Sequence, residues 1–166
     1  MSSIRDRLRA LEISLPAEPP PVVAGYVPAF APFVRTGNTL HLSGRLAKKD
    51  GRLWIGKVGH EVTAAEGAQA ARDIAVEMLA VMQAAVGDLE HITRVVRLMV
   101  FVNCTPQFTE PHVVANGASE VLTQVFGARG VHARSAVGVA STPFGACVEI
   151  DLVVEVADGS SRSEAG

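Results

Sequence analysis

This chain has little of several residue types on which particular classes of protein depend. Only two cysteines occur, Cys104 and Cys147, and they lack the spacing of a metal or redox motif. We expect both to be small buried hydrophobic side chains in a reducing compartment. Aromatic residues make up 5% of the chain. It has no basic, aromatic-studded strand of the kind on which RNA bases stack, which argues against an RNA-binding protein.

Long hydrophobic runs are also missing. No apolar stretch is long enough to span a bilayer, and the basic start of the chain is not followed by the apolar segment of a secretory signal. We therefore expect a cytoplasmic protein. Its net charge of -2 and pI near 6.2 provide no broad basic field, so nucleic acid is not the expected partner.

The common cofactor and catalytic motifs are absent from the sequence. Neither GxxxxGK[ST] nor GxGxxG occurs, so a nucleotide cofactor is not expected. The five histidines form no HxH, HxxxH or HExxH pattern, so no metal site is predicted. There is no GxSxG motif either. His132 lies two residues before Arg134, and a polar role at the end of a strand is favoured over a catalytic one.

What is present is enough for one globular domain of α+β type. The 166 residues are 48% hydrophobic, which supports an ordinary core. Residues 1–23 are predicted to form an N-terminal extension, with a short helix over Ser3–Ile13 and a proline-rich linker. Residues 24–157 form the single domain, and residues 158–166, which have nothing to bury, form a flexible tail.

The order of the predicted elements indicates a mixed β-sheet with two helices on one face. Thr63 and Glu66 form a capping-box pattern that starts a long helix ending at Gly87. The other expected elements are two extended pieces in Phe33–Leu46, a strand in His91–Asn103, a helix in Glu110–Phe126 and two further strands over residues 132–139 and 147–156. The His91–Asn103 strand is apolar on both sides, so the face without helices is expected to pack against other copies of the chain.

Two charged residues on the last two strands are the candidate site. Along the last strand, alternate side chains point to opposite faces, which puts Glu149 opposite the apolar Val148 and Ile150. If the last two strands form a hairpin in its simplest register, Arg134 shares the face of Glu149. An arginine fork beside small neighbours suits a small anion, but an interface salt bridge is equally compatible with the pattern. A glutamate on the polar face of a strand, such as Glu149, is more often a solvated side chain than a site residue.

From about Val22 to Val156 the sequence resembles the Rid family of reactive imine and enamine deaminases, also called the YjgF family and often labelled L-PSP endoribonucleases. The resemblance rests on the following segments: Arg35-Thr36-Gly37-Asn38-Thr39-Leu40-His41-Leu42-Ser43-Gly44, Gly56-Lys57-Val58-Gly59, Asn116, Ala133-Arg134-Ser135, Pro143 and Val148-Glu149-Ile150. The spacing from the arginine to the proline and on to the glutamate is its most specific part.

The resemblance implies a chorismate-mutase-like fold, assembled as a homotrimer with sites in the clefts between subunits. It also implies cofactor-free hydrolysis of 2-imino or enamine carboxylates to 2-keto acids and ammonia. By the same resemblance, Arg134 matches the arginine that grips the substrate carboxylate, and Glu149 the carboxylate that positions or deprotonates water. The resemblance further implies that Tyr26, Ser43 and Asn116 line the cleft and that the backbone at Ala136 completes the carboxylate contacts.

The chain departs from the family pattern in three segments, which marks a divergent subgroup. Ala136 stands where the better-known branch often has cysteine, and Ala24-Gly25-Tyr26 replaces Gly-Pro-Tyr. Arg45 follows Ser43-Gly44 where glutamine is usual; it either adds charge to the pocket or pairs with a carboxylate such as Glu149. A protein that binds a keto acid or another small carboxylate without turnover is therefore the alternative to a deaminase, and an endoribonuclease is the less favoured one.

Overall fold

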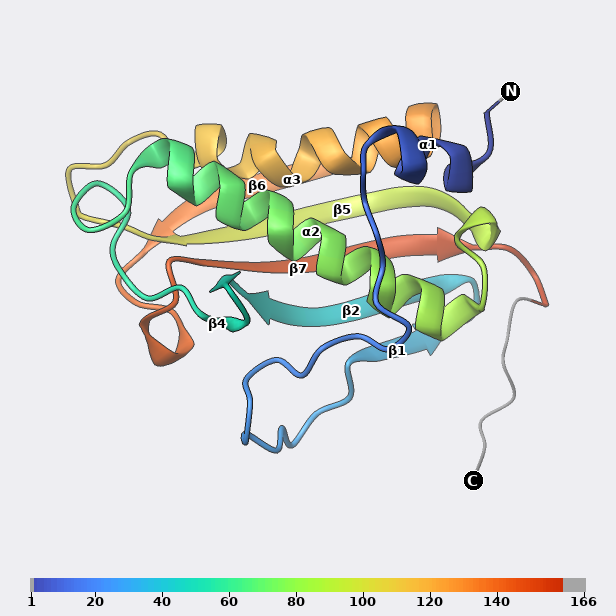
Figure 1. Ribbon diagram of the computed structural model, residues 1–166, viewed down its shortest axis with the longest axis horizontal. Coiled ribbons are helices and arrows are strands. Elements are labelled where there is room, and N and C mark those ends of the chain that lie inside the picture. The colour runs from blue at the N-terminus through green and yellow to red at the C-terminus, as the bar shows by residue number, and fades with distance from the viewer. Residues whose placement is uncertain (1, 160–166) are drawn as a thin grey trace.

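The structure is a computed structural model that describes residues 2–159, and it combines one mixed β-sheet with three α-helices (Figure 1). Its elements, in chain order, are α1 (Ile4–Ala10), β1 (Phe33–Thr36), β2 (Thr39–Leu46), β3 (Lys48–Lys49), β4 (Arg52–Leu53), α2 (Ala64–Val86), η1 (Leu89–His91), β5 (Ile92–Asn103), α3 (Pro111–Phe126), η2 (Gly127–Gly130), β6 (Ala133–Val139), η3 (Pro143–Gly145) and β7 (Val148–Val156).

Local sequence signals explain both long helices. Thr63 caps α2 by accepting a hydrogen bond from the backbone N–H of Glu66, whose carboxylate accepts one from the N–H of Thr63 in return. Gly87 ends the helix at a φ of 79°, a conformation that costs glycine little. α3 starts with Pro111 in its first turn and ends before Gly127. The predicted α+β elements are confirmed.

The five-stranded sheet has the order β1-β2-β7-β5-β6 (Figure 1). β7 pairs antiparallel with both β2 and β5, whereas β6 runs parallel to β5 at the edge. The prediction that the last two strands form a hairpin is therefore wrong, because β5 lies between them. The connection through η3 carries the chain from one side of β5 to the other.

An irregularity in β2 changes the direction of Arg45. The register with β7 shifts between Leu42 and Arg45, as a β-bulge does. Arg45 therefore pairs with Ile150 and is 4% exposed on the helix side of the sheet, where it contacts Glu77 of α2 at 2.9 Å. Of the two roles considered for Arg45, pairing with a carboxylate is the one observed, but the carboxylate is that of Glu77 and not that of Glu149.

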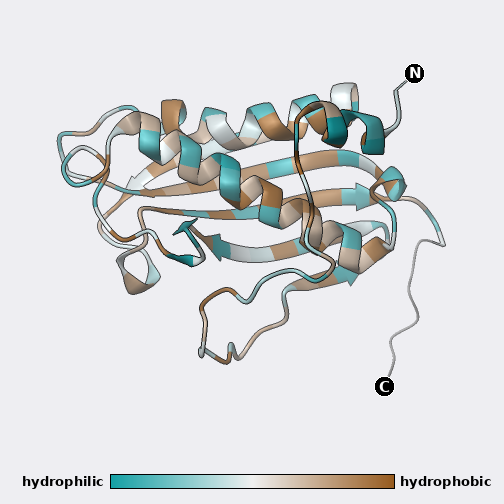
Figure 2. Ribbon diagram, in the orientation of Figure 1, coloured by the Kyte–Doolittle hydropathy of each residue, from teal (hydrophilic) through white to brown (hydrophobic). Residues whose placement is uncertain are grey.

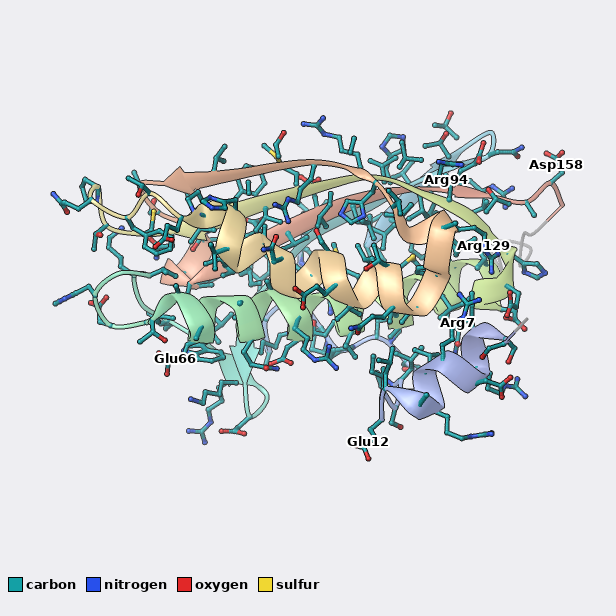
Figure 3. All side chains as sticks on the ribbon, turned by 90° about the horizontal axis from the view of Figure 1, so that it is seen from above. Arg7, Glu12, Glu66, Arg94, Arg129 and Asp158 are labelled. Atoms are coloured by element: carbon teal, nitrogen blue, oxygen red, sulfur yellow. The ribbon has the colours of Figure 1, made fainter. Side chains whose placement is uncertain are left out.

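Helices α2 and α3 lie side by side on one face of the sheet, as predicted, and the hydrophobic core lies between these two layers (Figures 1 and 2). Figure 3 shows that the opposite face carries side chains that none of the helices covers, Arg94 among them. Apolar side chains share that face: Val96 is 39% and Val137 38% exposed. No helix within residues 2–159 is long and apolar enough to cross a membrane.

The N-terminal extension packs on the same layer as the long helices. Ile4 is buried in the core, and its N–H donates to the Glu90 carboxylate at 2.7 Å. Arg7 donates to the carbonyl oxygen of Val125 near the end of α3. These contacts provide the docking that a seven-residue helix needs in order to persist. The flexible tail was predicted for a segment that lies, from residue 160 onward, outside the described residues.

Candidate functional site

Arg134 lies on the helix side of the sheet, at its edge. It pairs in register with Leu98 of β5, which is fully buried in the core, and paired residues of neighbouring strands point to the same face. Glu149 pairs instead with Phe101, whose neighbours Val100 and Val102 point into the core. The prediction that Arg134 and Glu149 share a face is therefore wrong within one chain.

The guanidinium of Arg134 is held by one face of α3. Its Nη1 donates to the Asn116 Oδ1 at 2.9 Å and to the Ser119 Oγ at 3.1 Å, and its Nη2 donates to the carbonyl oxygen of His112 at 3.4 Å. Positions 112, 116 and 119 follow the helical repeat and so lie on one side of α3. Among residues 2–159 nothing accepts a hydrogen bond from the Arg134 Nε, and no carboxylate pairs with this arginine. We call Arg134, Asn116 and Ser119 the arginine half-site.

Glu149 lies in a shallow hollow on the uncovered face of the sheet. Phe30, Ser43 and Asp151 also line this hollow, whose volume is about 470 Å³. Burial raises the pKa of Glu149, and the nearby charge of Asp151 raises it further. Burial also raises the pKa of Asp151. A carboxyl group whose pKa lies above its ordinary value is suited to exchange protons nearer neutral pH.

Gly44 makes room for the Glu149 side chain. A Cβ atom at position 44 would overlap the Glu149 Oε1, so only glycine permits this approach. Ser43 lies beside it, with its hydroxyl donating to the carbonyl oxygen of Ala31 at 2.7 Å and its N–H to that of Pro32. These two bonds tie the loop before β1 to the edge of the hollow. We call Glu149, Ser43 and Gly44 the glutamate half-site.

Tyr26 and Ala136 lie apart from the hollow that Glu149 lines. The ring of Tyr26 packs edge-on against that of Phe144 in η3, with 5.6 Å between the ring centroids, and 45% of the tyrosine is exposed. Ala136 is on β6 two residues beyond Arg134 and packs partly against the core. Because β6 pairs only with β5, its outer side carries backbone groups that the sheet does not use, as edge strands do.

The structure thus brings the predicted site residues together in two groups. Arg134 and Asn116 are in one, and Ser43 and Glu149 are in the other, on the opposite face of the sheet. Sequence reasoning missed Ser119 and Gly44. The helical spacing of His112, Asn116 and Ser119, outside the buried stripe of α3, is a signal that points to Ser119. Nothing in the pattern around Gly44 indicated how closely Glu149 approaches it.

The two cysteines take no part in either half-site. Cys104 and Cys147 are free and buried, as predicted, and burial raises the pKa of the Cys147 thiol to about 11. Its reactive thiolate form is therefore strongly disfavoured. Within residues 2–159, no three His, Cys, Asp or Glu side chains are gathered where they could hold a metal ion.

Comparison with known proteins agrees with this fold. The family described as "YjgF/chorismate_mutase-like, putative endoribonuclease" matches residues 6–156. Protein TCP17 of Trypanosoma cruzi is 48% identical over 151 residues, covering 90% of this chain and 91% of that protein. The chain therefore belongs to the YjgF/chorismate mutase-like family, as its sequence predicted.

Two solved structures resemble this one over most of their length. The protein Atu1372 of Agrobacterium tumefaciens, described as having unknown function, is 42% identical, with a TM-score of 0.82 and 93% of each chain covered. A protein of Shewanella oneidensis described as a "putative endoribonuclease" is 28% identical, with a TM-score of 0.84, covering 93% of this chain and all of that one. These relatives establish the chorismate-mutase-like fold class, and their descriptions leave the reaction open.

Proposed function

We propose that the protein hydrolyses small 2-imino or enamine carboxylates to 2-keto acids and ammonia, without a cofactor, in clefts between subunits of a homotrimer. The observation that carries this proposal is the division of the site. Within residues 2–159, Arg134 has the chemistry for a carboxylate ligand but no carboxylate paired with it, and Glu149 has the chemistry for a base but no Lys or Arg paired with it. Each half-site supplies what the other lacks.

A cyclic assembly joins such halves. In such an assembly the edge of β6 in one copy meets the uncovered face of the next copy, so that one Arg134 and one Glu149 flank each cleft. A head-to-tail interface of this kind repeats around a closed ring. The apolar groups on the uncovered face favour its burial, because Val96 and Val137 are exposed there and Met99 and Phe101 are only partly buried. Three copies then carry three sites.

The reaction follows from the groups assembled in the cleft. The Nε–H and an Nη2–H of Arg134 bind the substrate carboxylate as a fork, which fixes the planar imine. Glu149 accepts a proton from water as the water oxygen bonds to C2, and the imine nitrogen is protonated. The resulting carbinolamine loses ammonia when its hydroxyl proton is removed and its nitrogen protonated again, which leaves the 2-keto acid. Water and the imine are the only reactants.

The proposal is tested with an imine generated in place by an amino-acid oxidase. We expect Arg134→Ala to reduce the protein's acceleration of keto-acid release about a hundredfold or more, since oriented binding of the substrate is lost. The molecular mass of the assembly is measured alongside, and it should remain that of a trimer. Equal acceleration by wild type and Arg134→Ala would refute the proposal.

A carboxylate-binding protein without turnover is the second candidate. The packing of Tyr26 on Phe144, away from the hollow at Glu149, favours it, because this tyrosine then does not help to close the reaction site in the free chain. Saturable binding of pyruvate with no acceleration of imine hydrolysis would support this candidate.

Endoribonuclease activity has less support, since the net charge of -2 provides no electrostatic attraction for RNA. Cleavage of RNA by Arg134→Ala protein would support it.

A further inference from the structure

A second set of hydrogen bonds lies behind the arginine half-site. The Ser119 Oγ that accepts from Arg134 is also 3.0 Å from the Nε2 of His132, and the Nδ1 of His132 is 2.6 Å from the carbonyl oxygen of Gly130. His132 directly precedes β6, and Gly130 closes η2. The imidazole thus lies between the backbone of the η2 turn and the helix that holds the arginine.

When the His132 ring is neutral, chemistry fixes the direction of every bond in this row. A carbonyl oxygen can only accept, so the Nδ1 of His132 carries a hydrogen and donates to Gly130. In neutral imidazole the Nε2 must then accept, and the donor is the hydroxyl of Ser119. Because that hydroxyl donates its hydrogen to His132, a lone pair of its oxygen accepts the hydrogen bond from the Arg134 Nη1–H.

We propose that Ser119 and His132 are positioning residues that set the orientation of the Arg134 guanidinium for a carboxylate ligand. This proposal rests on the proposed function, in which Arg134 binds that carboxylate. The Nη1 is occupied twice, by Ser119 and by Asn116, and one Nη2–H donates to the carbonyl oxygen of His112, which leaves the Nε–H and the second Nη2–H without an acceptor within residues 2–159. Those donors form the fork that a carboxylate requires.

The hydroxyl of Thr123, also on α3, makes only hydrogen bonds within its own helix among the described residues. Its Oγ1 donates to the backbone carbonyl oxygens of Ser119 and Glu120, one turn back on the same helix, and it contacts neither His132 nor Arg134 through a hydrogen bond among the described residues. Thr123→Ala is therefore a matched control for Ser119→Ala, because both substitutions remove one hydroxyl from α3.

The test compares binding of pyruvate with that of its uncharged amide, pyruvamide, by calorimetry on the assembled protein. We expect Ser119→Ala to weaken pyruvate binding about tenfold, the scale of one lost hydrogen bond to a charged group, with little change for pyruvamide. Thr123→Ala should leave both affinities unchanged. For imine hydrolysis, Ser119→Ala should raise KM by a similar factor with kcat nearly constant, which identifies a binding role.

A double-mutant cycle tests whether His132 acts through Ser119. His132→Asn alone should weaken pyruvate binding several-fold, and adding it to Ser119→Ala should cause little further loss. Independent, fully additive effects would overturn the proposed row of bonds.

A readout independent of ligand is the tautomer of His132 in long-range nitrogen–proton NMR spectra. We expect the hydrogen on Nδ1, and a hydrogen on Nε2 of the neutral ring would overturn the proposal even if the protein is a deaminase. Unchanged pyruvate binding by Ser119→Ala, when Arg134→Ala abolishes it, would likewise refute the positioning role alone. Failure of the wild-type protein both to bind pyruvate and to hydrolyse imines would refute the proposed function and this inference together.

Discussion

At the residue scale, the surroundings of Arg134 and Glu149 differ in a way that suits different tasks. Arg134 keeps its charge in any environment and is fixed by three acceptors on α3, which favours recognition of an anion. The Glu149 carboxylate accepts no hydrogen bond among the described residues and has a raised pKa, which favours proton transfer. The sequence singled out both residues as candidates, but it did not predict that they lie on opposite faces of the sheet.

Gly44 provides a test of the glutamate at this scale. Because a Cβ at position 44 overlaps the Glu149 carboxylate, Gly44→Ala should displace that side chain and lower kcat for imine hydrolysis about tenfold or more. In the proposed cleft the carboxylate is bound by Arg134 and not by Glu149, so pyruvate should bind with nearly unchanged affinity. Gly51→Ala serves as the control for replacing a glycine near this strand. An added Cβ at position 51 meets no atom, and its φ of 73° adds only local strain in the turn. A Gly44→Ala protein with wild-type kcat would contradict the assigned role of Glu149.

At the scale of elements, the sequence predicted which segments are helices and strands better than it predicted their neighbours. The capping box at Thr63 and the glycines after both long helices are local signals, and they mark helix ends correctly. The partner of β6 is not a local property. Its alternation is compatible with pairing to β7 or to β5, and the connection from β5 through α3, which packs against both β5 and β6, selects the parallel arrangement. The bulge in β2 that turns Arg45 inward also leaves no mark on the hydrophobic pattern.

The charge cluster created by that bulge is expected to matter for stability. Glu77 pairs with both Arg45 and Lys48, whose side chains are 5% and 12% exposed. Arg45 also donates to the carbonyl oxygen of Pro20, which fastens the proline-rich segment to the sheet. Glu77→Gln leaves two largely buried cations without a counter-charge, so the free energy of unfolding should fall by about 2–4 kcal/mol in denaturant titrations.

The exposed pair of Arg9 and Asp6, 3.8 Å apart, supplies the comparison. Arg9→Gln should leave the denaturation midpoint unchanged, because solvent screens an ion pair at this exposure. If Glu77→Gln protein were as stable as Arg9→Gln protein, the cluster would have no structural role.

At the scale of the whole molecule, one chain is incomplete for the chemistry proposed. The core lies on the helix side of the sheet, and the opposite face offers apolar side chains beside the hollow at Glu149. The arginine half-site is at the far edge, on the other face. The apolar character of β5 on both sides predicted that this face packs against another copy, and the separation of Arg134 from Glu149 within the chain is an independent reason to propose the same assembly.

The most direct test of this account mixes two inactive proteins, Arg134→Ala and Glu149→Gln, and lets their subunits exchange. If every cleft takes its arginine from one copy and its glutamate from the next, random mixing in equal amounts restores an intact pair in about a quarter of the clefts. We therefore predict imine hydrolysis near one quarter of the wild-type rate from two proteins that are each inactive alone. No recovery of activity, in mixed assemblies whose subunit exchange is verified by mass spectrometry, would contradict a site shared between copies.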